Sequence, residues 1–281
     1  MNKTGIEYLD YTWNPIAMRC KPVSEGCANC WHMRTADRLK NNKKLNWRTR
    51  LAYGGEGDPI IVKSRLEEPS HRKKPSIIGV QFMGDLFHES VDDHSLLRIW
   101  SQMCVCGSFP KSPKHTFLVL TKRPKRMEDW VFAFFADENN TPRPVPSHIW
   151  IGVTVENQEQ ADKRIPVLLN IPAAVRFVSI EPMLSEIDLT RIESKRHDGC
   201  VSLWNVLRKN ISPNIDWVIA GCESGGNRRP SKIEWFRNLR DQCTNAGVPF
   251  FLKQMEINGK VVSMPELDGE IWRQWPEALK K

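Results

Sequence analysis

The fold is decided by residues 149–182, which read IWIGVTVENQEQADKRIPVLLNIPAAVRFVSIEP. Residues 149–155 form an apolar run rich in β-branched side chains, with little alternation between apolar and polar positions. Such a run is typical of a strand that is buried on both faces of its sheet. Residues 158–169 show the spacing of a helix, and residues 175–180 form a second apolar run. The segment therefore predicts a βαβ unit with two parallel strands.

The same pattern recurs along the chain. Further apolar runs occupy residues 77–83, 116–120, 217–222 and 248–252, and helical spacing recurs at residues 95–100, 124–135 and 231–246. With one more strand before residue 20, the alternation predicts an α/β fold in which mostly parallel strands form a partial or complete (β/α) barrel. We expect a single domain over residues 1–281, with a basic long loop or excursion at about 40–74 and a polar insertion at about 190–214.

Charged residues follow six of these predicted strands, at the point where each strand ends. They are Asp85, Lys122, Glu156, Glu181, Glu223 and Lys253. The active sites of parallel α/β barrels collect at the carboxyl ends of the strands. Any one of these residues alone would be an ordinary solvated loop charge. Six charged residues, each at the end of a predicted strand, indicate a common site.

The composition narrows the class of protein. Of the 281 residues, 40% are hydrophobic and 26% are charged, which excludes a disordered or fibrous chain. The longest uninterrupted apolar run, residues 130–136, is far below the ~18 residues of a membrane span, and no signal peptide is visible. We therefore expect a soluble cytoplasmic protein with no membrane partner.

The net charge of +8 favours an anionic partner, either nucleic acid or a nucleotide. Residues 40–50, which read KNNKKLNWRTR, are the best candidate for a nucleic-acid-binding patch because they combine basic residues with an aromatic one. The same composition also suits a solvated helix end and loop.

Three of the eight cysteines lie close together, with the spacing Cys20-x6-Cys27-x2-Cys30. In a protein without a secretion signal, such cysteines are expected to be free thiols or metal ligands. Three thiolates can hold a cubane iron–sulfur cluster with one iron left open to a small ligand. With His32 as fourth ligand they could instead hold zinc, in a zinc-stabilised nucleic-acid-binding protein without catalysis. Plain buried cysteines are the third alternative.

Several further segments accompany this cysteine motif. They are TWNP (12–15), GCANC (26–30), MGDLFHE (83–89), FLVLTKRP (117–124), WIGVTVEN (150–157), SIEPML (179–184), DWVIAGCESG (216–225) and FLKQ (251–254). On these segments, which span most of the chain, the protein resembles the phage-associated three-cysteine-motif family, a family similar to the radical S-adenosylmethionine (SAM) enzymes.

The resemblance implies a [4Fe–4S] cluster held by Cys20, Cys27 and Cys30, with SAM bound to the open iron. Reductive cleavage of SAM, supplied by an external electron donor, yields a 5′-deoxyadenosyl radical that abstracts hydrogen from the substrate. The implied substrate is a nucleic-acid base or nucleotide, such as a phage DNA base that is rearranged or hypermodified. The chain departs from the usual motif in two ways. The first spacing is six residues rather than three, and Asn29 replaces the aromatic residue before the third cysteine, so Trp31 is the expected substitute for adenine contact.

The resemblance also implies cofactor contacts at the strand ends. Gly84 and Asp85 match the position that contacts the methionine ammonium, where a carboxylate suits a charge-assisted hydrogen bond. We expect Lys122 and Arg123 to pair with the SAM carboxylate, and Thr154 and Glu156 to accept ribose hydroxyls. Ser179 closes the far side of the site.

Substrate contacts and catalysis are expected from Glu181, Cys222, Glu223 and Lys253. The Cys222 thiol is also a candidate donor of a hydrogen atom to a product radical. As a small residue at the end of a strand, Cys222 equally suits simple burial.

Overall fold

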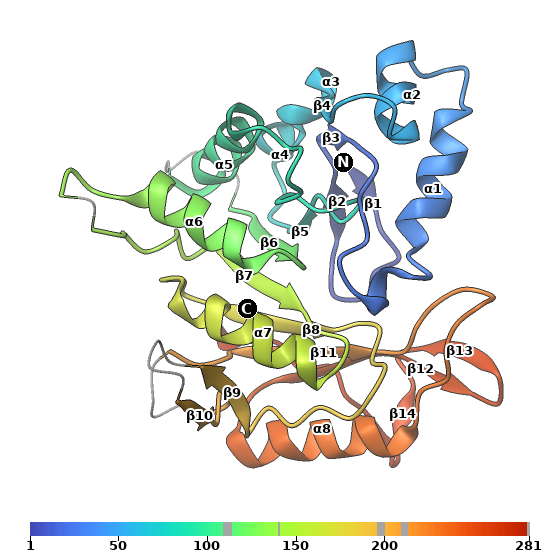
Figure 1. Ribbon diagram of the computed structural model, residues 1–281, viewed down its shortest axis with the longest axis vertical. Coiled ribbons are helices and arrows are strands. Elements are labelled where there is room, and N and C mark those ends of the chain that lie inside the picture. The colour runs from blue at the N-terminus through green and yellow to red at the C-terminus, as the bar shows by residue number, and fades with distance from the viewer. Residues whose placement is uncertain (109–113, 140, 196–199, 209–212, 280–281) are drawn as a thin grey trace.

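The computed structural model describes residues 1–108, 114–139, 141–195, 200–208 and 213–279 (Figure 1). Its centre is a nine-stranded sheet in the order β1-β2-β5-β6-β7-β8-β11-β12-β13. The pairings from β2 through β12 are all parallel, and β1 and β13 are antiparallel strands at the two edges. The prediction of an α/β fold with mostly parallel strands is therefore confirmed.

The strands of this sheet follow chain order. Their bounds are β1 Asn2–Lys3, β2 Tyr11–Trp13, β5 Ile77–Val80, β6 Thr116–Thr121, β7 Ile149–Thr154, β8 Arg176–Ile180, β11 Trp217–Gly221, β12 Phe250–Ile257 and β13 Lys260–Ser263. Short strands lie outside it: β3 Ile16–Ala17, β4 Ile60–Ile61, β9 Ile192–Lys195, β10 Val201–Trp204, β14 Glu266–Leu267 and β15 Glu270–Ile271.

Helices connect most of the parallel strands. They are α1 Trp31–Lys40, α2 Trp47–Gly54, α3 Lys63–Leu66, α4 Glu68–His71, α5 Asp93–Ser108, α6 Pro124–Phe135, α7 Gln158–Asn170 and α8 Ile233–Ala246. Local signals set several of their ends. Asn157 caps α7 by accepting a hydrogen bond from the Gln160 N–H at 2.9 Å, and Gly247 ends α8 with a φ of 65°.

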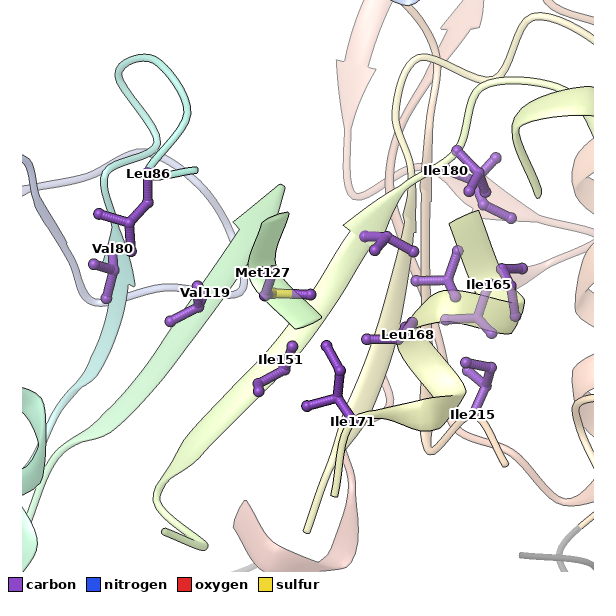
Figure 2. Close-up of a cluster of buried hydrophobic side chains, with 14 of the residues drawn as sticks. Val80, Leu86, Val119, Met127, Ile151, Ile165, Leu168, Ile171, Ile180 and Ile215 are labelled. Atoms are coloured by element: carbon purple, nitrogen blue, oxygen red, sulfur yellow. The ribbon is translucent and has the colours of Figure 1, made fainter. Parts of the chain in front are cut away.

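One face of the sheet packs against these helices. Figure 2 shows Val119 of β6 and Ile151 of β7 facing Met127 of α6 and Leu168 of α7. All four side chains are completely buried. Because each fully buried aliphatic side chain stabilises the fold by roughly 1.5–3 kcal/mol, this layer holds the helices to the strands and fixes where the strand ends lie.

The opposite face carries large aromatic side chains. Three of them contact Trp217 of β11 with ring centroids 6.0–6.1 Å apart: Trp150 of β7, Phe177 of β8 and Phe251 of β12. Tyr8, which precedes β2, lies 5.7 Å from Phe251. Six strand steps in a flat sheet would separate β2 from β12 by about 29 Å. The sheet is therefore strongly curved, although no pairing joins its two edge strands within the described ranges.

The basic excursion at residues 40–74 is more regular than the long loop that its polar composition indicated. It contains α2, β4, α3 and α4, and α2 packs on α1 through the buried side chains of Ala52 and Tyr53. The insertion at residues 190–214 contains the antiparallel hairpin of β9 and β10, while residues 196–199 and 209–212 lie outside the described residues. In the part of the chain that the structure describes, no helix is long and apolar enough to span a membrane.

Candidate functional site

The carboxyl ends of the parallel strands surround a cavity of about 210 Å³. All the residues expected at the site line it, with one exception. They are Cys20, Cys27, Cys30, Trp31, Gly84, Asp85, Lys122, Thr154, Ser179, Glu181, Cys222, Glu223 and Lys253. The exception, Glu156, contacts the lining residues Gly26 and Lys122. Residues as far apart in the chain as Cys20 and Lys253 therefore meet at one place.

The three clustered cysteines lie on residues 18–30, which lead from β3 into α1 and which we call the cysteine segment. Cys30 directly precedes the first residue of the helix. All three are free and partly exposed toward the cavity. Burial, with the nearby Asp85 carboxylate, raises the pKa of the Cys20 thiol to about 11. At neutral pH this side chain is therefore a protonated thiol.

Glu156 fastens this cysteine segment to the end of β7. Its Oε1 accepts a hydrogen bond from the Gly26 N–H at 3.3 Å, and its Oε2 lies 2.9 Å from Arg164 and 3.6 Å from Lys122. Burial alone would raise the pKa of Glu156, but Lys122 and Arg164 outweigh it and hold that pKa below its usual value. A Cβ on Gly26 would lie 2.8 Å from the Glu156 carboxyl carbon, so only glycine permits this contact. Glu156 thus tethers the cysteine segment to β7, and its contact with the ribose stays a prediction.

Glu223 forms a second tether, at the end of β11. Its carboxylate accepts a hydrogen bond from Asn29 Nδ2 at 3.0 Å and pairs with Arg229 at 2.6 Å. Burial would raise the pKa of Glu223, but the bonds from Arg229 and Asn29 lower it to about 2. Asn29, the residue directly before Cys30, thus joins the cysteine segment to the sheet through its amide.

Asp85 and Arg123 form the third attachment. Asp85 accepts hydrogen bonds from Thr121 Oγ1 at 2.6 Å and from the Lys122 N–H at 3.1 Å, and it pairs with Arg123 at 3.1 Å. Arg123 also donates to the Lys21 carbonyl at 2.9 Å and lies 3.8 Å from Cys20 Sγ. Both oxygens of Asp85 are thus already engaged within the chain, so a SAM ammonium would have to share them.

Glu181 organises another part of the cavity lining. It pairs with Lys253 Nζ at 2.9 Å and accepts hydrogen bonds from Ser179 Oγ at 3.1 Å and from the Tyr8 hydroxyl at 3.2 Å. Burial and the Glu181 carboxylate raise the pKa of Tyr8 well above its ordinary value. The sequence reasoning missed Tyr8, because it precedes the first predicted strand and belongs to no motif.

Cys222 lies buried at the end of β11, and its backbone carbonyl accepts a hydrogen bond from Gln254 Nε2 at 2.7 Å. Burial, with the Glu256 carboxylate, raises the pKa of its thiol to about 11, so the S–H form predominates at neutral pH. An intact S–H group inside the cavity is the form that can donate a hydrogen atom.

Trp31 and His32, at the start of α1, differ in their surroundings. The Trp31 side chain is 42% exposed at the rim of the cavity, whereas His32 is buried. Burial and the Arg19 charge lower the pKa of His32 to about 4, so its imidazole is neutral at pH 7.

A zinc site needs its ligands around a single ion. Among the described residues, no group of three or more His, Cys, Asp or Glu side chains is arranged to hold one metal ion. A cubane cluster binds one cysteine per iron and so spreads its thiolates over several metal atoms. The three free thiols line one cavity, and both metal assignments, the cluster and the zinc site, stay predictions.

A family model described as "Protein of unknown function (DUF5131)" matches residues 3–276. No curated protein and no solved structure matches the chain significantly.

Proposed function

We propose that this chain, which belongs to the DUF5131 family of proteins of unknown function, is a radical SAM enzyme. One observation carries the proposal: three free cysteines share a cavity with the polar strand ends of a curved parallel sheet. In this proposal the curved sheet is a partial (β/α) barrel of the radical SAM type. Its carboxyl edge is where such folds place their active sites.

Cys20, Cys27 and Cys30 would hold a [4Fe–4S] cluster, and the reducing cytoplasm that we propose as the location keeps their thiols free. When bound, the cluster and SAM supply a 5′-deoxyadenosyl radical, with the electron coming from an external donor. The three tethers at Glu156, Glu223 and Asp85–Arg123 hold the cysteine segment in place.

The remaining residues of the cavity bind and orient the reactants. Lys122 carries a positive charge toward the cavity and can pair with the SAM carboxylate, while Thr154 offers a hydroxyl group to the ribose. The partly exposed Trp31 ring is available for stacking on adenine. Glu181 and Lys253 offer paired charges to a substrate, and the Cys222 S–H group is the hydrogen donor of the proposal.

The proposed substrate is a nucleic-acid base or nucleotide. The net charge of +8 supports an anionic partner, and α2 carries an exposed aromatic–basic pair in which the Arg48 guanidinium lies 5.3 Å from the ring centre of Trp47. Such a pair suits stacking on a base. Whether the reaction that follows is an isomerisation, an elimination or a transfer depends on that substrate.

Replacing one cluster ligand tests the assignment. We expect Cys30→Ala to abolish 5′-deoxyadenosine formation from SAM under dithionite and to lower the iron content of anaerobically reconstituted protein. Circular dichroism should stay unchanged, because Cys30 is half-exposed and does not belong to the apolar core. Cys200→Ala, at an exposed cysteine outside the cavity, is the matched control and should behave as wild type.

The rival outcomes are distinct. Wild-type protein with about four irons per chain supports the cluster. A colourless protein with one zinc per chain, or SAM cleavage that survives in Cys30→Ala, would overturn the proposal in favour of a zinc-stabilised nucleic-acid-binding protein or another activity.

A further inference from the structure

A second cavity of about 290 Å³ adjoins the first, with which it shares Asn29, Cys30 and Ser224. It lies between the start of α1 and the loop that follows β11. The other lining residues are Ala28, Met33, Arg34, Gly225, Gly226 and Asn227. The lining contains one formal charge, the Arg34 guanidinium, and no carboxylate. Its electrostatic character is therefore cationic.

The loop after β11 has unused hydrogen-bond donors on its backbone. The N–H groups of residues 224–227 donate to no acceptor within the described part of the chain. Two carbonyls of the loop, in contrast, are engaged: Gly225 O accepts from Arg228 Nη1 at 3.1 Å, and Asn227 O accepts from Asn29 Nδ2 at 2.8 Å. A loop with four available N–H groups is polarised to receive an anion.

Arg34 lies directly against this loop. A Cβ added at Gly225, where φ is +105°, would lie 2.6 Å from Arg34 Nη2, so the guanidinium packs on the bare glycine backbone. Arg34 is exposed and pairs with no carboxylate of the described ranges, whereas Arg228 and Arg229 are neutralised by Glu256 and Glu223. Arg34 is therefore the positive group of this cavity that is still open to a ligand.

We propose that this second cavity binds a phosphate group of the substrate, using Arg34 and the backbone N–H groups of residues 224–227. The inference rests on the proposed function in that it places the nucleoside part of a nucleotide in the first cavity, beside the cysteines. A guanidinium presents two parallel donors that match two phosphate oxygens, and the glycine loop supplies further donors. The ion pairs of Arg228 and Arg229 hold that loop in position before the ligand arrives.

Binding to the metal-free protein tests the subsite separately from catalysis. The probes are the four deoxynucleoside 5′-monophosphates and the four matching nucleosides, titrated calorimetrically into wild type, Arg34→Gln and Arg143→Gln. Arg143 is an exposed arginine in the connection that enters β7, at the amino end of the strands, so its variant loses the same charge far from the cavity. Thermal unfolding of each variant checks that it is folded.

We expect at least one monophosphate to bind about tenfold or more tightly than its nucleoside, the range for one or two charge-assisted hydrogen bonds. Arg34→Gln should remove this preference and Arg143→Gln should retain it. Equal affinity for nucleosides and monophosphates, no binding of any monophosphate at millimolar concentration, or equal losses in the two variants would overturn the proposal. Failure of SAM cleavage in the reconstituted wild type would refute the enzyme assignment but leave the phosphate preference intact.

Discussion

The tether at Glu223 makes a quantitative prediction for Glu223→Gln. The variant keeps the size of the side chain but removes the charge that Arg229 and Asn29 bind. The pKa of Glu223 is held at about 2, against an ordinary value of 4.5. At 1.36 kcal/mol per pH unit, that difference sets a ceiling of about 3.4 kcal/mol. Because a third of the Arg229 side chain is exposed and solvent screens the pair, we expect about 1–2 kcal/mol.

The pH dependence follows from the direction of the shift. A carboxylate whose pKa is lower in the folded than in the unfolded state stabilises the fold at every pH above the unfolded value. That stabilisation disappears as the pH falls from about 4.5 toward about 2. Wild type should therefore exceed Glu223→Gln in stability at pH 7, and the difference should shrink steadily below pH 4.5.

Urea unfolding of both proteins between pH 7 and pH 2.5 measures this difference. Glu159→Gln is the control, because Glu159 pairs with Lys163 on the surface of α7 and both side chains are more than 60% exposed. Such a pair contributes roughly 0.2–0.5 kcal/mol. Equal unfolding midpoints of wild type and Glu223→Gln at pH 7, or a gap that does not change with pH, would refute the tether.

Two further predictions concern the buried parts of the fold. Asp85→Asn should lower the free energy of unfolding by about 3–5 kcal/mol, because it leaves the buried Arg123 guanidinium without its Asp85 partner. An unchanged midpoint of urea unfolding would contradict this and show that the ion pair with Glu89 is enough to compensate the Arg123 charge. Gly152→Ala should cost about 1–3 kcal/mol, because its Cβ would lie 2.5 Å from the Phe177 ring. Gly5→Ala, where nothing lies within 4 Å of the added carbon, is the control, and equal melting temperatures of the two glycine variants would contradict the packing described for β7 and β8.

The strand ends were predictable because they depend on order along the chain. Parallel strands expose their carboxyl ends at one edge, so the apolar runs alone predict that Asp85, Lys122, Glu181 and Lys253 meet there. The structure brings all four to one cavity.

The partners of individual side chains were not predictable in the same way. The sequence places Glu156 and Glu223 beside the site, but their contacts with Gly26 and Asn29 depend on the path of the cysteine segment. That path is set by tertiary contacts, which no local spacing encodes. Tyr8 was missed for a related reason, since only the curvature of the sheet brings it to Glu181.

The excursion at residues 40–74 shows that polar composition alone does not predict its secondary structure. Its polar character predicts a loop, yet residues 47–54 form α2. That helix buries Thr49, Ala52 and Tyr53, so its apolar stripe is too short to give a clear helical pattern. Contact with α1 provides the burial that the sequence alone does not reveal.

The tethers also join parts of the chain that a ribosome makes far apart in time. Asn29 and Glu223 are separated by 194 residues, and Tyr8 and Glu181 by 173. Elongation at ~5–20 residues per second leaves about 10–40 s between synthesis of the three cysteines and synthesis of Glu223. During that interval the nascent chain carries three thiols without the residues that position them. The Glu223 tether and the complete cavity thus form only after most of the chain has been made. A chain that terminates before β11 would present the thiols with neither the Glu223 tether nor the far side of their cavity.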